Sequence, residues 1–160
     1  MIYALDTNVI LDVLFRDEKF HEDSKTALER CSLKGNFIIS PEVYSEMISA
    51  FSYEYKRPEE ELDDFLERKQ ITLRSHTQKS LTKAGKGWKN NKTGGVQCSA
   101  CGKSNSPECE SCGSDLSWRN HIITDFMIGG HAEELANAII TRDSGYFENY
   151  FNLNIVDPSR

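Results

Sequence analysis

Apolar runs and helix-like segments alternate along this chain, which is typical of a protein built from strands and helices in turn. Residues 2–5 are apolar and stop at Asp6, as in a buried strand. Apolar residues then recur at helical spacing over 9–14, and Thr7 can cap that helix. A second helix with a polar face is predicted over 17–33 and ends just before Gly35.

The alternation continues through the rest of the chain. Residues 37–39 predict the second strand, and Ser40-Pro41 and Arg57-Pro58 each begin a helix, because proline is tolerated at the first helical position. Residues 71–73 are ambiguous, and a helix is predicted for 76–91. The later pattern predicts helices at 120–135 and 146–150 and strands at 138–141 and 154–156.

Strands that alternate with helices favour an α/β fold, with a mainly parallel sheet sandwiched by helices. The chain of 160 residues is long enough for one such domain with a small appendage. Residues 90–118 are rich in Asn, Ser, Gly and Cys and nearly lack large aliphatic side chains, so they cannot build a core of their own. We therefore expect one domain over 1–160 that an insertion interrupts.

Charge and hydropathy narrow the classes of protein further. No apolar run approaches the ~20 residues of a membrane-spanning helix, and acidic residues interrupt the apolar N-terminus, so we expect a cytoplasmic protein with no membrane partner. The net charge of −6 conceals a segregation, because residues 68–92 hold eight basic and no acidic side chains. This segment is either a basic contact surface beside an acidic site or a solvated helix face.

Acidic residues recur where the predicted strands end, at the edge of an open parallel sheet that binds ligands. Asp6 follows the first strand, and Asp143 follows the strand at 138–141. Glu46 and Asp125, on neighbouring predicted helices, can complete a cluster. Each acid taken alone is weak evidence for a site, because an Asp that follows a strand is more often a helix cap, and any one acid can be an unrelated surface charge.

Four short motifs carry these acids. They are Asp6-Thr7-Asn8, Ser40-Pro-Glu-Val-Tyr-Ser-Glu46, Asp125-Phe-Met-Ile-Gly-Gly-His-Ala132 and Thr141-Arg-Asp-Ser-Gly-Tyr-Phe147. In this order they resemble the PIN-domain nucleases, with the closest likeness to toxins of the VapC type, over most of the chain except 90–118. The resemblance implies a PIN-like fold, a catalytic acidic quartet and two supporting polar residues. The quartet is Asp6, Glu46, Asp125 and Asp143, and the supporting residues are Asn8 and Thr141.

The chemistry of an acidic quartet suits a divalent cation. Clustered carboxylates repel one another, and a hard cation such as Mg²⁺ or Mn²⁺ relieves that repulsion through oxygen ligands. The cation lowers the pKa of bound water and neutralises the charge that develops on a phosphate, so we expect the quartet to serve as both metal ligands and catalytic residues. Glu42 is a rival for Glu46, but the helix dipole explains a carboxylate in the first helical turn. We expect structural or surface roles for the four histidines, His21, His76, His121 and His131.

The insertion carries two Cys-x-x-Cys-Gly motifs. Their cysteines are Cys98, Cys101, Cys109 and Cys112. Each motif can place two thiolates on one tetrahedral Zn²⁺, and a closed Cys₄ set leaves no open position, so we expect a structural zinc knuckle at 94–117. Paired disulfides or a redox pair are the alternatives. Cys31 is expected in the core, and Trp88 and Trp118 either pack the insertion on the body or stack on an exposed base.

These observations predict a divalent-metal-dependent endoribonuclease that hydrolyses RNA phosphodiester bonds. The resemblance implies a toxin with a cognate antitoxin, a homodimer, and products with a 5′-phosphate and a 3′-hydroxyl. Four lysines share one face of the predicted helix at 76–91, and we expect them to bind RNA. They are Lys79, Lys83, Lys86 and Lys89. One alternative is a housekeeping PIN endonuclease of rRNA or tRNA processing, whose zinc ribbons the insertion resembles, and another is a non-catalytic zinc-containing RNA-binding module.

Overall fold

The computed structural model describes residues 1–90, 96–97, 103–105, 111 and 123–160. In these ranges the chain forms a sheet of five parallel strands in the order β3-β2-β1-β6-β7. The strands are β1 (Ile2–Leu5), β2 (Asn36–Ile39), β3 (Ile71–Leu73), β6 (Ala138–Ile140) and β7 (Asn154–Val156). A separate antiparallel pair, β4 (Val96–Gln97) and β5 (Ser104–Asn105), lies within the predicted insertion.

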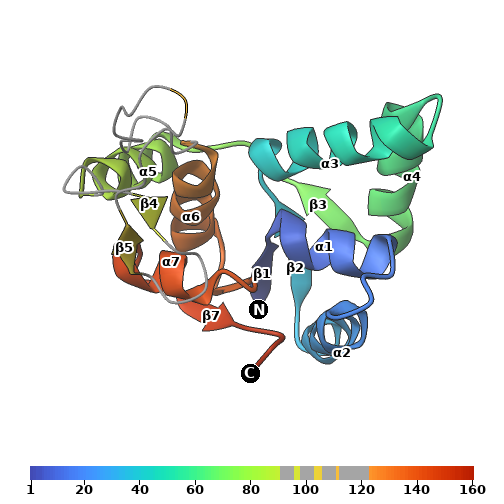
Figure 1. Cartoon of the computed structure of the whole chain (residues 1–160), viewed down its shortest axis with the longest axis horizontal. Coiled ribbons are helices and arrows are strands. Elements are labelled where there is room, and N and C mark those ends of the chain that lie inside the picture. The colour runs from blue at the N-terminus through green and yellow to red at the C-terminus, as the bar shows by residue number, and fades with distance from the viewer. Residues whose placement is uncertain (91–95, 98–102, 106–110, 112–122) are drawn as a thin grey trace.

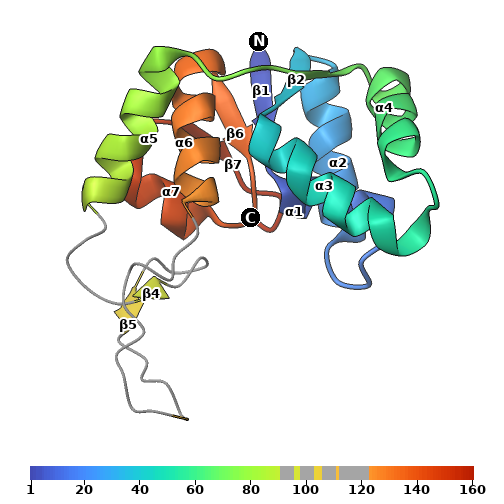
Figure 2. The same ribbon diagram turned by 90° about the horizontal axis from the view of Figure 1, so that it is seen from above.

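Seven helices flank the five-stranded sheet in the described part of the chain. They are α1 (Thr7–Leu14), α2 (His21–Ser32), α3 (Pro41–Glu54), α4 (Pro58–Lys69), α5 (Gln78–Asn90), α6 (Thr124–Leu135) and α7 (Ser144–Tyr150). Helices α5, α6 and α7 gather on one side of the molecule and α1 to α4 on the other, with β1 and β2 between them (Figure 1). The view from above keeps α5 beside α6 and sets the β4–β5 pair apart from the main sheet (Figure 2). The predicted α/β fold with a parallel sheet is therefore confirmed.

The core is formed by the apolar faces that the sequence pattern predicted. Leu5 and Ile139, on adjacent strands, are fully buried together with Met47 of α3 and Phe126 of α6. Cys31 of α2 is buried among apolar side chains, as expected for a small core residue. Within the described ranges, no helix is both long and apolar enough to cross a membrane.

In two places a side chain that competes with the helix moves its start or cap away from the predicted position. Thr7 does not cap α1, because Asp6 occupies the cap position and its side chain accepts a hydrogen bond from the Thr7 backbone N–H at 2.7 Å. Helix α2 begins at His21 rather than near 17, because the Asp17 carboxylate accepts hydrogen bonds from the backbone N–H groups of Lys19 and Phe20, both at 2.9 Å. In both cases a side chain that competes for backbone N–H groups sets the boundary.

Glycines on α6 allow α5 to pack unusually close to it. A Cβ atom added at Gly130 would lie 2.5 Å from the Ser80 carbonyl oxygen and 2.6 Å from the Ala84 nitrogen, both in the backbone of α5. The two helices run antiparallel, since Lys83 contacts Glu133 while Gly87 lies against Phe126. The C-terminal end of α5 therefore lies beside the N-terminal end of α6.

Candidate active site

Four separate elements bring the four acids of the predicted quartet to the carboxyl edge of the sheet. Asp6 ends β1 and caps α1, and Asp143 follows β6 at the start of α7. Glu46 lies in the second turn of α3, and Asp125 lies in the first turn of α6. Strands β1 and β6 are adjacent, with Leu5 opposite Ile140, so the two acids that follow these strands emerge side by side.

Two polar side chains hold Asp6 and Asp143 in place. The Thr141 hydroxyl donates to Asp6 Oδ2 at 2.6 Å, and the Asn8 amide donates to the same oxygen at 2.9 Å. The Asn8 amide also lies 3.2 Å from Asp143 Oδ2, so it joins the two carboxylates. The Thr141 hydroxyl in turn accepts the backbone N–H of Asp143 at 3.0 Å. Asn8 and Thr141 therefore both contact carboxylates of the predicted quartet.

The other two acids differ in how they are held. Glu46 accepts a hydrogen bond from the Thr7 hydroxyl, which ties α3 to the start of α1. Asp125 accepts no hydrogen bond from any residue in the described ranges, but it interacts electrostatically with Glu46, Asp143 and Asp6. The four carboxylates therefore form one electrostatic neighbourhood.

Burial and mutual repulsion disfavour the ionised forms of two of these acids. Asp6 is only 7% exposed, and its burial is the largest cause that raises its pKa to about 7. The charges of Asp143 and Asp125 raise this pKa further, while hydrogen bonds from Thr141 and Thr7 oppose the rise. Burial, followed by the charges of Glu46 and Asp143, raises the pKa of Asp125 to about 6.

Comparison with known proteins agrees with this architecture. Residues 3–89 match the family model of the PIN domain. The chain belongs to the PIN-domain family. No curated protein sequence matches it significantly.

Solved structures share the fold at low sequence identity. VapBC2 from Rickettsia felis, bound to a DNA fragment from its promoter, is 20% identical with a TM-score of 0.64, and the match covers 98% of each chain. VapBC-1 from nontypeable Haemophilus influenzae is 21% identical with a TM-score of 0.65, over 100% of both chains. FitAcB from Neisseria gonorrhoeae is 17% identical with a TM-score of 0.63, over 100% of this chain and 99% of that one. At these identities the similarity shows a common fold.

The donor atoms of this PIN domain suit Mg²⁺ or Mn²⁺, which prefer oxygen ligands. The acidic neighbourhood offers carboxylate oxygens without thiol or imidazole, and the raised pKa values of Asp6 and Asp125 reflect a negative charge that a cation would compensate. Within the described ranges, no three Asp, Glu, His or Cys side chains stand close enough to hold a metal ion directly. Mg²⁺ commonly keeps several waters and uses only one or two carboxylates, so the donor set fits such a cation.

Histidines and the rival acid Glu42 of the PIN domain form a separate cluster. His76 Nε2 lies 2.8 Å from Glu42 Oε2, and its Nδ1 lies 3.0 Å from the Ser80 hydroxyl. The buried His131 places Nε2 2.8 Å from the Arg74 carbonyl oxygen, and its ring lies edge-on to that of His76. These groups join α3, α5 and α6. His121 lies outside the described residues.

A half-buried ion pair beside the quartet was missed from the sequence. The Arg142 guanidinium donates twice to Asp12, from Nε at 2.8 Å and from Nη2 at 3.0 Å, and it lies over the Phe20 ring. Ser24 also donates to Asp12, at 2.6 Å. The position of Arg142 between Thr141 and Asp143 is a signal in the sequence, but its partner lies 130 residues away.

Tyr146 of α7 was also missed. Its side chain is 4% exposed, and its hydroxyl has no hydrogen-bond partner within the described part of the chain. Burial, followed by the charge of Asp125, raises the pKa of Tyr146 far above its ordinary value. A buried polar atom without a partner is rare in proteins, so this hydroxyl requires an explanation.

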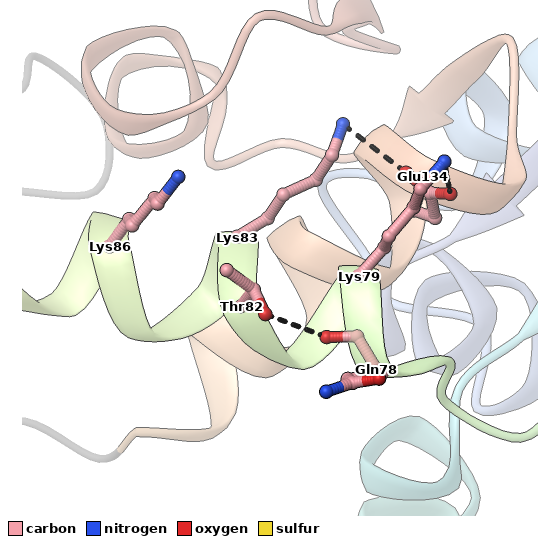
Figure 3. A pocket seen from close by; sticks show the side chains of 6 residues that line it. All are labelled: Gln78, Lys79, Thr82, Lys83, Lys86 and Glu134. Carbon is pink, nitrogen blue, oxygen red and sulfur yellow. Dashed lines mark hydrogen bonds and ion pairs between the residues drawn. The ribbon is translucent and has the colours of Figure 1, made fainter.

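The four predicted RNA-binding lysines lie on α5, but the structure divides them into two pairs. Lys83 lies 2.9 Å from Glu133 and 3.5 Å from Glu134, and Lys79 lies 3.7 Å from Glu134. Figure 3 shows Lys83 and Lys79 turned toward Glu134, whereas Lys86 extends separately from the next turn of the helix. A pocket of about 480 Å³ is lined by Gln78, Lys79, Thr82, Lys83, Lys86 and Glu134. Lys86 and the exposed Lys89 make no ion pair with any described residue.

The zinc-knuckle prediction lies outside the described residues, since they include none of Cys98, Cys101, Cys109 and Cys112. Trp118 lies outside them as well. Trp88, at the other flank of the insertion, is partly buried and packs against the hydrophobic core. This position of Trp88 agrees with a packing role near the base of the insertion.

Proposed function

We propose that this PIN domain is a divalent-metal-dependent endoribonuclease that hydrolyses RNA phosphodiester bonds. One observation carries the proposal: four separate elements bring Asp6, Glu46, Asp125 and Asp143 into a single electrostatic neighbourhood at the carboxyl edge of the sheet. A set of unrelated surface acids would not be half-buried or buried together, because burial penalises each charge.

The bound cation would supply Lewis-acid stabilisation of the phosphate and a water of lowered pKa. The chain's own groups prepare the site for it. The Asn8 amide and the Thr141 hydroxyl orient Asp6 and Asp143, and the Thr7 hydroxyl orients Glu46. Because the pKa of Asp6 is raised to about 7, about half of the Asp6 carboxyls would be protonated at neutral pH, and a bound cation would favour their ionised form.

Negatively charged RNA needs cationic contacts beside an acidic site. Lys79, Lys83, Lys86 and Lys89 are the proposed contacts, with the larger share assigned to the last two. Lys86 and Lys89 are exposed and lie at the end of α5 that packs beside the N-terminal end of α6, which carries Asp125. Glu133 and Glu134 partly neutralise the other pair at the far end of α6.

The toxin role is the biological part of the proposal. It is supported by the motif resemblance to VapC-type toxins and by the common fold with the VapBC structures over the full chain. A cognate antitoxin and a homodimer follow from that role. The cysteine-rich insertion favours the second candidate, a housekeeping RNA-processing nuclease, since zinc ribbons accompany enzymes of that kind. Arrest of growth on expression, reversed by the product of a neighbouring gene, would support the toxin, and harmless expression would support the housekeeping enzyme.

We further propose that the four cysteines of the insertion hold one structural Zn²⁺. The two Cys-x-x-Cys-Gly motifs support this proposal, because each provides two thiolates and a glycine for the tight turn around the metal. The zinc would be separate from the catalytic cation, which prefers oxygen ligands.

RNA cleavage by the purified chain tests the nuclease proposal. Cleavage is expected with Mn²⁺ or Mg²⁺ and is expected to stop in EDTA. Asp6→Asn is expected to lose most activity, and Glu59→Gln, which removes the same charge from an exposed position on α4, is expected to keep it. Full activity of Asp6→Asn, or cleavage unchanged by EDTA, would contradict the proposal.

A further inference from the structure

Among the residues that the structure describes, the acidic neighbourhood contains one acceptor and one donor that lack hydrogen-bond partners. Within the described residues, each of the other three carboxylates has its own side-chain donor: Thr141 and Asn8 for Asp6, Asn8 for Asp143, and Thr7 for Glu46. Asp125 has none. The Tyr146 hydroxyl is buried and donates to no described residue.

These two groups lie near each other. Asp125 is the charged residue that acts most strongly on the Tyr146 hydroxyl. The Tyr146 ring packs edge-on against Phe126, the residue after Asp125, with ring centroids 5.3 Å apart. The two groups are nevertheless not hydrogen-bonded to each other. A buried donor and a half-buried acceptor that are close but not bonded are a common setting for a bridging water.

We infer that Tyr146 is a positioning residue of the site: its hydroxyl donates a hydrogen bond to a water molecule that also bonds to Asp125, and this bridge orients the Asp125 carboxylate toward the cation. The inference rests on the proposed function, because it assigns Asp125 to cation binding. It is consistent with the other donors of the site, since Thr7, Asn8 and Thr141 already donate to carboxylates and leave Tyr146 as the free donor among the described residues nearby.

An unpaired buried hydroxyl is not explained by packing alone. A phenylalanine at 146 would fill the same space against Phe126 and Phe147 without a desolvated polar atom. A hydroxyl that served only packing would therefore destabilise the fold. A hydroxyl that orients a metal ligand would instead increase the affinity of the site for the metal, as groups hydrogen-bonded to metal ligands usually do.

Tyr146→Phe tests the inference, with Tyr150→Phe as the matched control on the same helix. Mn²⁺ binding to metal-free protein is measured by calorimetry, and the free energy of unfolding is measured in EDTA. We expect Tyr146→Phe to bind Mn²⁺ about tenfold more weakly, while its metal-free stability stays the same or rises. The turnover number for RNA should fall while KM stays unchanged. Tyr150→Phe should leave Mn²⁺ affinity unchanged: the Tyr150 ring also packs on Phe126, with centroids 5.1 Å apart, but burial alone raises the pKa of Tyr150 and no acid of the quartet contributes.

The outcomes separate this inference from the proposed function. If the wild type binds Mn²⁺ and Tyr146→Phe binds it equally well, the inference is wrong and the proposed function stands. If the wild type binds no Mn²⁺, the proposed function itself fails. Should Tyr146→Phe misfold, a high-resolution crystal structure of the wild type decides, because a water within hydrogen-bonding distance of both Tyr146 Oη and Asp125 supports the bridge and its absence refutes it.

Discussion

Neutralising Asp6 should stabilise the metal-free protein above neutral pH. The folded state raises the pKa of Asp6 from 3.8 to about 7, so ionised Asp6 is less favourable in the folded than in the unfolded chain. This unfavourable contribution to the free energy of unfolding begins near pH 4, where Asp6 ionises in the unfolded chain. It reaches its full size above about pH 7, where Asp6 is ionised in the folded chain as well. At about 1.4 kcal/mol for each pKa unit, a rise of about 3 units corresponds to ~4 kcal/mol at pH 8.

Asp6→Asn removes this contribution but loses part of the hydrogen bonding. Asparagine still caps α1, because its amide oxygen accepts the Thr7 N–H as Asp6 does. It cannot replace Oδ2 as the acceptor for both Asn8 and Thr141, which costs about 1–2 kcal/mol. We therefore expect a net gain of ~2–3 kcal/mol in the free energy of unfolding at pH 8. At pH 5 the folded-state carboxyl is protonated, and the two effects should nearly cancel.

Urea unfolding followed by circular dichroism, in EDTA at pH 5 and pH 8, measures this difference. The control is Asp12→Asn, which neutralises a buried acid that Arg142 already compensates. That variant should lose about 3 kcal/mol at both pH values, because it leaves the guanidinium without its partner. An Asp6→Asn variant whose stability relative to wild type is the same at pH 5 and pH 8 would refute the reasoning, and so would a loss of stability at pH 8.

Three further predictions follow from other parts of the molecule. Gly85→Ala should stabilise the protein by about 0.5–1 kcal/mol, because nothing lies within 4 Å of the new methyl group. Gly130→Ala should destabilise it by more than about 1 kcal/mol, because its methyl group would enter the backbone of α5. Thermal unfolding measures both changes. Replacing Lys86 and Lys89 by Gln should weaken RNA binding and reduce the steepness of log affinity against log salt by roughly 0.7 for each lost contact. Replacing Lys79 and Lys83, which pair with α6, should reduce both quantities less. Equal effects of the two double variants would contradict this assignment. Metal analysis of protein purified without added zinc should give about one zinc per chain, and Cys98→Ser should lose it; zinc-free protein with intact disulfides would contradict the knuckle.

The sequence pattern predicted most of the elements because they obey local rules. Ser40-Pro41 begins α3 and Pro58 begins α4, as their capping and proline positions predicted. The strands at 37–39 and 154–156 followed from short apolar runs between polar segments. The ambiguous run at 71–73 became a strand because its backbone pairs with β2, a long-range contact that a local pattern does not contain.

The site was predictable to the extent that its residues belong to motifs. Two short motifs contain four residues that contact one another: Asp6, Asn8, Thr141 and Asp143. Contacts that depend on helix packing were missed. The bond from Thr7 to Glu46 needs α3 to lie against α1, and the pairing of Lys83 with Glu133 needs the glycine-mediated approach of α5 and α6.

The register of the sheet brings the first and the last of the four motifs together in one site. Within the first motif the Asn8 amide donates to the Asp6 carboxylate, and within the second the Thr141 hydroxyl accepts the backbone N–H of Asp143. Since β1 and β6 pair in parallel and the Asp6 N–H bonds to the Ile140 carbonyl at 3.1 Å, the two units are set side by side, and each donor reaches the carboxylate of the other. Among the described residues, Glu46 and Asp125 have no donor within their own motifs. Glu46 accepts a hydrogen bond from Thr7 on another helix, and in our inference Tyr146 orients Asp125 through a bridging water. Substitutions in the two paired motifs should therefore disturb the site directly, while changes in helix packing should act on it through Glu46 and Asp125.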